Sequence, residues 1–350
     1  LGLDLPLIPA QPPSPKDGSY IPFEYDESVY SENVFSNNEM VNVEVLGSMR
    51  GLRIARIDVS PVQYNPVTGA IRVYSNIEAE VIFDGADVLA TLEQKKKNEA
   101  PYFRSVGRNL INYKAETSLA NRDTITKYPV KYVIVSDPMF ESQLQAFVEW
   151  KTRKGFTVVE AYTDDPAVGN TTNSIKSYLQ GLYDAGTASD PAPTFVLFVG
   201  DVAQIPAWDG NSSFHITDLL YVEYTGDYFP EIYYGRWSAT NAAELQPQID
   251  KTLQYEQYTM PDPSYLDEVV MVAGMDAGHG NDWGNGQINY GTENYLNLAH
   301  GLTSHTYLYP ESGSHAVDIR QNISDGVSFG NYTAHCSPNG WADPVFSISQ

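Results

Sequence analysis

The stretch YVIVSDPMFESQLQAFVEWKTRKGFTVVEAY, residues 132–162, changes its hydrophobic period twice. It opens with a short apolar run, Tyr132–Val135, and a second run follows at Phe156–Val159. Between these runs, three apolar residues recur at the spacing of one helix face: Leu144, Phe147 and Val148. Gly155 then marks the end of the helix. The stretch therefore predicts a strand, a helix and a second strand, which is the repeating unit of a parallel sheet.

The same alternation continues toward the C-terminal end. Apolar runs predict further strands at Phe195–Val199, Val269–Ala273 and Val327–Tyr332. Helical spacing predicts helices around residues 175–182, 245–253, 286–300 and 315–324. Strands that alternate with helices predict an α/β domain whose mostly parallel sheet is covered on both faces.

Residues before about 127 follow a different pattern. Val41, Val43 and Val45 alternate with polar residues, and period two returns at Ile71–Val73 and Ile77–Phe83. The turn-forming cluster Asn65–Gly69 interrupts these runs. This pattern predicts an N-terminal all-β domain, a sandwich, preceded by an extended arm over residues 1–20 and followed by a connector at about 100–127.

The composition restricts the function. With 21 basic and 44 acidic residues the net charge is −23, which argues against a nucleic-acid partner and against an anionic membrane surface. No run of about 18 apolar residues is present, so we expect no transmembrane segment. The residues after Leu1 lack the basic leader and apolar core of a signal peptide, so we expect a processed product or a trimmed piece.

The single cysteine, Cys336, excludes an internal disulfide framework and a multi-cysteine zinc site. Carboxylate oxygens suit calcium, and six of them fall within residues 201–231: Asp201, Asp209, Asp218, Glu223, Asp227 and Glu231. A structural calcium ion is one interpretation of this cluster, and a solvated acidic loop is the other.

Polar residues follow three of the predicted parallel strands. Gly200-Asp201 comes after the third strand, Asp276 after Val269–Ala273, and His335 after Val327–Tyr332. Sites in open parallel sheets form beyond the carboxyl ends of the strands. If the last two strands are neighbours, Asp276 and His335 approach as an imidazole base and its orienting carboxylate. The alternatives are a structural histidine and a loop carboxylate or cation ligand.

The nucleophile for such a base is missing from the pattern. Cys336 directly follows His335, and adjacent side chains of an extended segment point to opposite faces. We interpret Cys336 as a packing residue or a wall of the site, with a reactive thiol as the alternative. Ser337 is a weak candidate because no G-x-S-x-G elbow occurs.

The motifs together resemble those of the gingipain family, secreted bacterial cysteine proteases with a caspase-like core. NYTAHCSPNGWADP (331–344) is similar to the family's segment around the catalytic histidine, and TFVLFVGDVAQIPAW (194–208) to its central strand. Residues 132–162 and 217–256 are similar to its first βαβ unit and to the segment with a G-R strand. PVQYNPVTGAIRVYSNIEAEVIF (61–83) looks like its β-sandwich prodomain.

The resemblance implies a domain order and a set of roles. It implies a prodomain over 1–122, a caspase-like subdomain A over 128–262 and a subdomain B over 263–350. His335 matches the catalytic histidine and Asp276 its orienting acid. Cys336 stands where the family usually has the glycine of the oxyanion hole. The resemblance implies a substrate pocket at Thr333, Gln287 and Trp341. It does not indicate after which substrate residue the peptide bond is cleaved.

In the resembled family the catalytic cysteine follows the histidine by roughly thirty residues, beyond Gln350. We therefore expect this chain to hold the base and its orienter but not the nucleophile, and to be inactive as it stands. No cofactor is required for this chemistry. The alternative is a non-catalytic secreted or surface binding protein on the same scaffold.

The resemblance also implies latency. The prodomain would act as an intramolecular inhibitor by offering a basic residue to the pocket, with four candidates: Arg104, Arg108, Lys114 and Arg122. We expect activating cleavage near residues 122–128, a protein or peptide substrate, and a secreted or cell-surface location.

Overall fold

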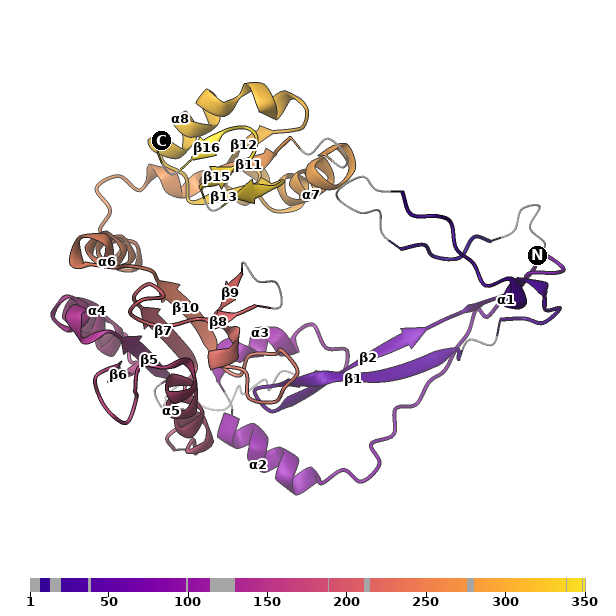
Figure 1. Cartoon of the computed structure of the whole chain (residues 1–350), viewed down its shortest axis with the longest axis horizontal. Helices are drawn as coiled ribbons and strands as arrows, with labels where there is room; N and C mark the ends of the chain where they lie inside the picture. Colours follow the sequence, from indigo (N-terminus) through magenta and orange to yellow (C-terminus); the bar gives the residue numbers. More distant parts are fainter. Residues whose placement is uncertain are drawn as a thin grey trace. The chain divides into compact units, whose positions relative to one another are not determined.

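The computed structural model describes residues 7–12, 20–36, 39–98, 100–113, 130–187, 189–210, 215–275, 280–337, 339–347 and 349. The chain divides into two compact units, Leu1–Leu253 and Gln254–Gln350. Each unit contains a parallel sheet (Figure 1).

The sheet of the first unit has four strands in the order β10-β7-β5-β6. They are β5 (Lys131–Ser136), β6 (Thr157–Tyr162), β7 (Phe195–Val199) and β10 (Tyr233–Trp237). All neighbouring pairs are parallel, which confirms the prediction made from residues 132–162. The hydrophobic period did not predict β10, because its sequence YYGRW mixes aromatic residues with glycine and arginine.

Helices cover both faces of this sheet (Figure 1). They are α4 (Glu141–Arg153), α5 (Thr172–Asp184) and α6 (Ala242–Gln257). Because side chains alternate along a strand, Val133 and Val135 pack with α5, whereas Ile134 packs with α4 and α6. Full burial of each such side chain contributes about 1.5–3 kcal/mol. The helix α4 ends before Gly155, whose φ of 92° is one that other residues rarely adopt.

The sheet of the second unit has the order β12-β11-β13 and is also parallel. Its strands are β11 (Glu268–Ala273), β12 (Thr303–Tyr307) and β13 (Phe329–Thr333). Helix α7 (Asn285–Asn294) packs on one face through Ile288, and α8 (Ala316–Asp325) packs on the other through Ile319. A small antiparallel sheet follows β13, formed by β14 (Cys336–Ser337), β15 (Gly340–Trp341) and β16 (Phe346–Ser347). The pattern missed β12 because TSHTY is a polar edge strand.

The predicted N-terminal sandwich is not confirmed. The described residues form two separate two-stranded hairpins. These are β1 (Val41–Met49) with β2 (Leu52–Val59), and β3 (Val62–Asn65) with β4 (Ala70–Val73). The turn between β3 and β4 was predicted correctly, and Asn65 Oδ1 accepts from the N–H groups of Val67 and Thr68.

The remaining N-terminal elements are helices: α1 (Glu27–Ser31), α2 (Val88–Asn98), η1 (Pro101–Phe103) and α3 (Arg104–Gly107). The segment 77–83, which was predicted as a strand, is irregular. Period two indicates a strand with one buried face, but here Val43 is 46% and Val45 52% exposed. Alternation alone therefore could not show whether a second sheet covers the hairpin.

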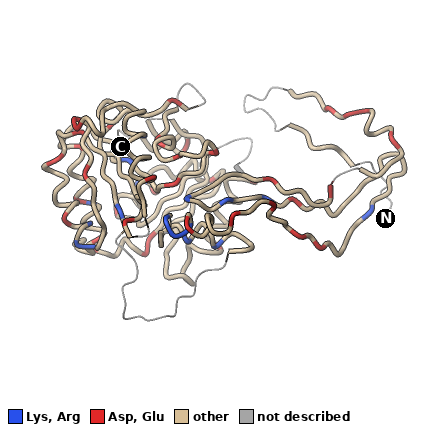
Figure 2. Tube along the Cα trace, turned by 90° about the horizontal axis from the view of Figure 1, so that it is seen from below, with Lys and Arg blue, Asp and Glu red and all other residues tan. Residues whose placement is uncertain are grey.

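Short elements complete the two units. They are η2 (Pro138–Phe140), β8 (Trp208–Asp209), β9 (Ile216–Thr217), η3 (Leu219–Tyr221), η4 (Ser264–Asp267), η5 (Gly280–Gly284), η6 (Leu298–His300) and η7 (Glu311–Ser314). Acidic residues are spread along the whole described trace rather than gathered in one segment (Figure 2). None of the helices in the described ranges combines the length and the apolar character that crossing a membrane requires.

Candidate active site

The site predicted from the strand ends begins at β11 and β13. These strands are direct neighbours, with Ala273 paired to Thr333 at their carboxyl ends. Just beyond them, Gly274 N donates to Thr333 O at 3.1 Å, and His335 comes two residues after Thr333. The sequence analysis required these two strands to be neighbours for Asp276 and His335 to approach each other. That condition is met. Asp276 itself lies outside the described residues.

A hairpin holds the backbone of His335. The Tyr332 hydroxyl donates to His335 O at 2.9 Å and to Asp343 O at 3.0 Å. Ala342 N donates to the same His335 carbonyl at 3.1 Å. The Tyr332 ring stacks on Trp341 with centroids 4.1 Å apart and planes 7° apart. The imidazole of His335 is exposed and stands on this fixed backbone.

Gly274 makes the close approach of β11 to the hairpin possible. A Cβ at this position would lie 2.5 Å from the Tyr332 ring and 2.6 Å from Asp343 O. The next residue, Met275, donates its N–H to the same Asp343 carbonyl at 2.9 Å. The end of β11 and the hairpin after β13 are therefore joined at Gly274 and Met275.

Cys336 has an exposed side chain and an ordinary strand conformation in β14. It faces Trp341 across the hairpin, and the bond from Ala342 N to His335 O makes these two a non-hydrogen-bonded pair. In such a pair the N–H groups point away from the partner strand. The Cys336 N–H therefore points outward beside His335, with a backbone that does not need glycine.

The residues predicted for the substrate pocket fall into two groups. The Thr333 hydroxyl donates to Gln287 Oε1 at 3.1 Å and accepts from Asn331 Nδ2 at 3.0 Å, so Thr333 and Gln287 lie together. Trp341 instead packs into the hydrophobic cluster under α8. In that position the Trp341 ring stacks on the ring of Tyr332.

Within the first unit, hydrogen bonds fix the segment that follows β7. Gly200 N donates to Trp237 O, and the Arg236 guanidinium donates to Gly200 O and Ile205 O, both at 2.9 Å. Arg236 also makes a bidentate ion pair with Asp218, at 2.8 and 2.6 Å. These bonds fix the loop that carries Asp201. One of the six clustered carboxylates, Asp218, is therefore occupied by an ion pair with Arg236.

Three further carboxylates of the acidic cluster bind protein groups: Glu223, Glu231 and Asp227, the last of which accepts from Ser48 N at 2.6 Å. Glu223 accepts from the N–H groups of its own loop, and Glu231 accepts from Tyr224 N and Thr225 Oγ1. Burial raises the pKa of Glu231 to about 7, and the neighbouring Glu223 and Asp227 charges add to this. Within the described part of the chain, no three metal-ligating side chains converge. The calcium ion stays a prediction.

Of the basic residues suggested for the pocket, Arg104 and Arg108 lie at α3, where Arg104 is half-buried and Arg108 exposed. Lys114 and Arg122 fall outside the described residues, as does the whole of the expected cleavage window at 122–128.

Two structural residues escaped the sequence analysis. Tyr332 holds the histidine backbone, and Arg50 is 4% exposed at the tip of the β1–β2 hairpin. The only local signal for Arg50 was the Gly51 that follows it, which marks a turn. The bonding partners of Arg50 are distant in sequence.

Comparison with known families agrees with this geometry. Residues 125–350 match the model of peptidase family C25, and residues 10–119 match the model of the C25 propeptide. The chain belongs to peptidase family C25 and carries its propeptide.

Individual relatives are gingipains. Lys-gingipain W83 of Porphyromonas gingivalis is 39% identical over 348 residues, which are 98% of this chain and 20% of that protein. Gingipain R2 of P. gingivalis is 27% identical over 308 residues, 86% of this chain and 40% of that protein. The chain thus spans about a fifth of the length of the Lys-gingipains that it matches.

Solved structures show the same fold. A structure titled "Structure of Protease" aligns with a TM-score of 0.58 at 40% identity, over 63% of this chain and 48% of that one. The Arg-specific cysteine proteinase gingipain R aligns with a TM-score of 0.53 at 23% identity, over 66% of this chain and 52% of that one. The predicted caspase-like α/β architecture with a parallel sheet is confirmed at the level of the gingipain fold.

Proposed function

We propose that residues 1–350 form the propeptide and the histidine-bearing part of the catalytic domain of a secreted or surface-bound cysteine endopeptidase. One observation supports this proposal: the parallel pairing of β11 with β13 puts Ala273 beside Thr333, and these strand ends come three residues before Asp276 and two residues before His335 in the sequence.

In this proposal His335 accepts the proton of a cysteine thiol, and Asp276 orients the imidazole. The thiolate attacks the peptide carbonyl, whose oxygen becomes negative, and the outward Cys336 N–H donates to that oxygen. The histidine then gives its proton to the leaving amine, and water hydrolyses the acyl-enzyme. No metal is needed for these steps.

Cys336 is not the nucleophile in this proposal. Cys336 directly follows His335 at the start of a hairpin strand, where adjacent side chains point to opposite faces. The thiol and the imidazole are therefore not favoured to form a pair of productive geometry. Since Cys336 is the single cysteine of residues 1–350, these residues alone do not cleave peptides. The nucleophile would come from another segment of the full-length protein.

The propeptide would keep the enzyme latent until it is cut, and proteins or peptides would be the substrates. The names of the relatives point to Lys or Arg before the cleaved bond, and the higher identity to the Lys-gingipains favours Lys. A structural calcium ion is compatible with this function but is not required by it.

Three variants test the proposal in the full-length gene product, with lysyl and arginyl peptide substrates. His335→Ala should lower kcat by about 10²–10⁴-fold, the range for a lost general base. Cys336→Gly should keep kcat within about threefold, because the backbone N–H remains. Ser337→Ala serves as the neighbouring control. A loss in Cys336→Gly as large as in His335→Ala would make Cys336 the nucleophile and contradict these roles.

The second candidate is a non-catalytic binding protein, which is favoured by a cysteine at the position where the resembled family usually has glycine. In that case the full-length product would cleave neither substrate, and His335→Ala would change nothing. A single cooperative thermal unfolding transition in wild type and in His335→Ala would then confirm that the tested protein is folded.

A further inference from the structure

Arg50 lies at the tip of the β1–β2 hairpin, yet it is only 4% exposed. Met49 pairs with Leu52, so Arg50 and Gly51 form a two-residue turn, with φ of 48° and 78°. Such turns favour glycine, asparagine or aspartate, because other side chains are strained at positive φ. The contacts of the arginine side chain must therefore offset the strain of its backbone.

The guanidinium of Arg50 donates four hydrogen bonds to backbone carbonyls. Nε donates to Asn98 O at 2.8 Å, within the propeptide. The other three acceptors belong to the catalytic part, residues 125–350, and we call them the carbonyl cage. They are Pro193 O at 2.6 Å, Glu231 O at 2.9 Å and Ala192 O at 3.0 Å.

The carbonyl cage is fixed by the backbone of the catalytic part itself. Thr194, which directly follows two residues of the cage, donates its N–H to Lys131 O at 3.0 Å and accepts from Tyr233 N at 2.9 Å. The third residue, Glu231, donates its N–H to Val222 O at 2.9 Å. None of these bonds involves the propeptide. The three carbonyls are therefore held in place without help from Arg50.

The cage suits a guanidinium in particular. Converging carbonyl oxygens attract a cation, and the planar fork of a guanidinium reaches several of them at fixed angles, which an ammonium does not. The guanidinium carbon also lies 4.9 Å from the ring centre of Phe103 and 5.8 Å from that of Tyr183. Burial lowers the pKa of Arg50 to about 10, so the group stays charged at neutral pH.

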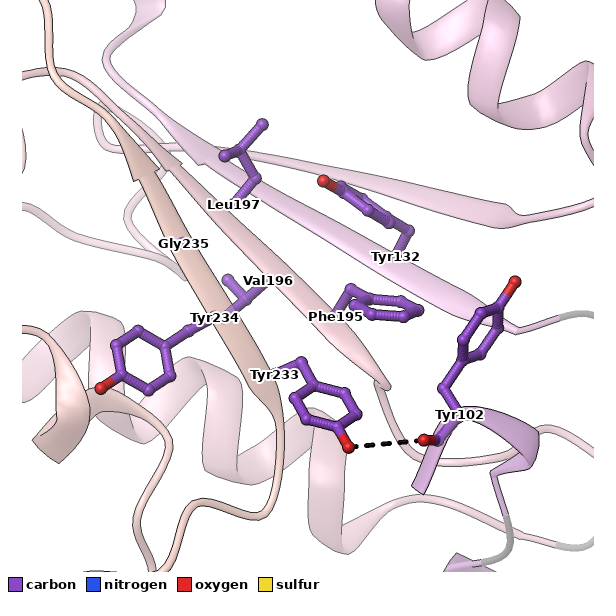
Figure 3. A pocket seen from close by; sticks show the side chains of 8 residues that line it. All are labelled: Tyr102, Tyr132, Phe195, Val196, Leu197, Tyr233, Tyr234 and Gly235. Atoms are coloured by element: carbon purple, nitrogen blue, oxygen red, sulfur yellow. Dashed lines mark hydrogen bonds between the residues drawn. The ribbon is translucent and has the colours of Figure 1, made fainter. Parts of the chain in front are cut away.

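Aromatic rings of the catalytic part lie next to the cage. Tyr233 stacks on Phe103 with centroids 4.1 Å apart, and Phe195 meets Tyr102 edge-on at 4.9 Å. Tyr233 also donates its hydroxyl to Tyr102 O at 3.4 Å (Figure 3). Phe195 and Tyr233 line an open pocket of about 490 Å³, together with Tyr132. A ring that accompanies an arginine therefore has a stacking surface beside the cage.

The cage lies away from the predicted chemistry of this sheet. Two of its residues come just before β7, which begins at Phe195, and Glu231 comes just before β10, which begins at Tyr233. The cage is therefore at the amino ends of the strands. Active sites in parallel sheets lie at the carboxyl ends, where Gly200 follows β7.

We propose that the carbonyl cage is a guanidinium-binding site of the catalytic part, and that it takes the arginine side chain of a peptide ligand when the propeptide, with Arg50, is absent. The net charge of −23 attracts such basic ligands. The ligand would bind at a place separate from the cleaved bond. The inference takes from the proposed function only the loss of the propeptide.

The first test empties the cage in the 350-residue chain with Arg50→Ala and adds methylguanidinium at millimolar concentrations and constant ionic strength. The Tm of the variant should rise saturably, by about 3–6 °C at ten times the dissociation constant. Wild type should not respond, because Arg50 fills the cage. Arg56→Ala is the matched control, because Arg56 lies on the same hairpin and its side chain is 55% exposed.

Methylammonium tests whether the site distinguishes the two cations, and it should raise the Tm of Arg50→Ala far less. Arg50→Gly, which relaxes the positive φ, covers the case in which Arg50→Ala does not fold. A folded Arg50 variant that responds to methylguanidinium no more than wild type would overturn the proposal, as would equal responses to the two cations. The readout is stability, so the result does not depend on whether the full-length protein is a protease.

The second test asks whether a peptide is bound. A fluorescent peptide with a phenylalanine and an arginine is titrated into the matured full-length product, whose active site has been closed with a covalent inhibitor. If the product is no protease, the inhibitor is omitted. Replacing the arginine of the peptide with lysine should weaken binding about tenfold. Tyr233→Leu should weaken it severalfold, whereas the exposed Tyr255→Leu should not. Equal affinities for the arginyl and lysyl peptides would contradict the peptide ligand.

Discussion

The Thr333 hydroxyl donates a hydrogen bond to Gln287 Oε1, which joins the end of strand β13 to the first turn of helix α7. Both residues were predicted to line the substrate pocket, and the fold brings them together from positions 46 residues apart. The role of this hydrogen bond in the proposed pocket can be tested by substitutions that leave His335 unchanged.

We expect Thr333→Val to raise KM by about 2–10-fold and leave kcat within about twofold, because one hydrogen bond of about 0.5–1.5 kcal/mol is lost and the shape is kept. Steady-state kinetics of the full-length gene product measure this. Thr303→Val, an exposed change on the edge strand β12, is the control. A large fall in kcat at unchanged KM would contradict a role for Thr333 in substrate binding.

Tyr332→Phe removes both hydrogen bonds that the hydroxyl donates, to His335 O and Asp343 O, but keeps the stacking on Trp341. We expect a loss of about 0.5–1.5 kcal/mol of stability and a fall in kcat of about tenfold, because the two carbonyls lose the hydroxyl but keep their backbone donors, Ala342 N and Met275 N. Thermal unfolding and kinetics check the two effects. The exposed Tyr255→Phe on α6 should change neither, and wild-type kcat in Tyr332→Phe would argue that the hairpin alone positions the histidine.

Gly274→Ala tests the close approach of β11 to the hairpin. A methyl group there would meet Asp343 O at 2.6 Å, so the hairpin must shift. We expect a destabilisation of about 1–3 kcal/mol, the cost typical of overpacking. Hydrogen exchange should show the loss at β14–β16 rather than at the first unit's sheet. Gly286→Ala is the matched control, because nothing lies within 4 Å of its added Cβ.

Arg236→Lys should destabilise the first unit by about 3 kcal/mol. It breaks a bidentate ion pair with Asp218 in which the two side chains are only 13% and 15% exposed. It also removes donors from Gly200 O and Ile205 O. Denaturant unfolding measures the change, and Arg153→Lys on exposed α4 should be near neutral. An equal, small effect of both changes would show that the buried pair adds little.

Glu231 predicts a pH dependence of stability. Its folded-state pKa of about 7 is above the ordinary value of 4.5, so its proton stabilises the fold fully below about pH 4.5. That contribution is lost as the pH rises through 7, and it amounts to about 3 kcal/mol. Glu231→Gln keeps an acceptor for Tyr224 N and should therefore gain stability relative to wild type between pH 5 and pH 8.

Unfolding free energies at several pH values test this sign. The exposed Glu149→Gln should follow the wild-type curve throughout. A stability difference between Glu231→Gln and wild type that stays constant from pH 5 to pH 8 would show that Glu231 titrates in its usual range.

The sequence by itself determined the strands of the two parallel sheets except β10 and β12. Val133, Ile134 and Val135 form a continuous apolar run because both faces of their strand are covered, and Leu144 and Phe147 recur at the helical period. These signals are local, since they depend on residues within one or two turns. The position of His335 directly after a strand was visible for the same reason.

Only the tertiary structure decided which strands are neighbours and what the N-terminal hairpins pack against. The pairing of Ala273 with Thr333 joins residues 60 positions apart in the chain, and Arg50 bonds Pro193 across 143 positions. No periodicity records such contacts, because the partners are backbone carbonyls that every residue carries. The sandwich prediction was not confirmed for this reason: alternating valines specify a strand, but not the surface that covers it.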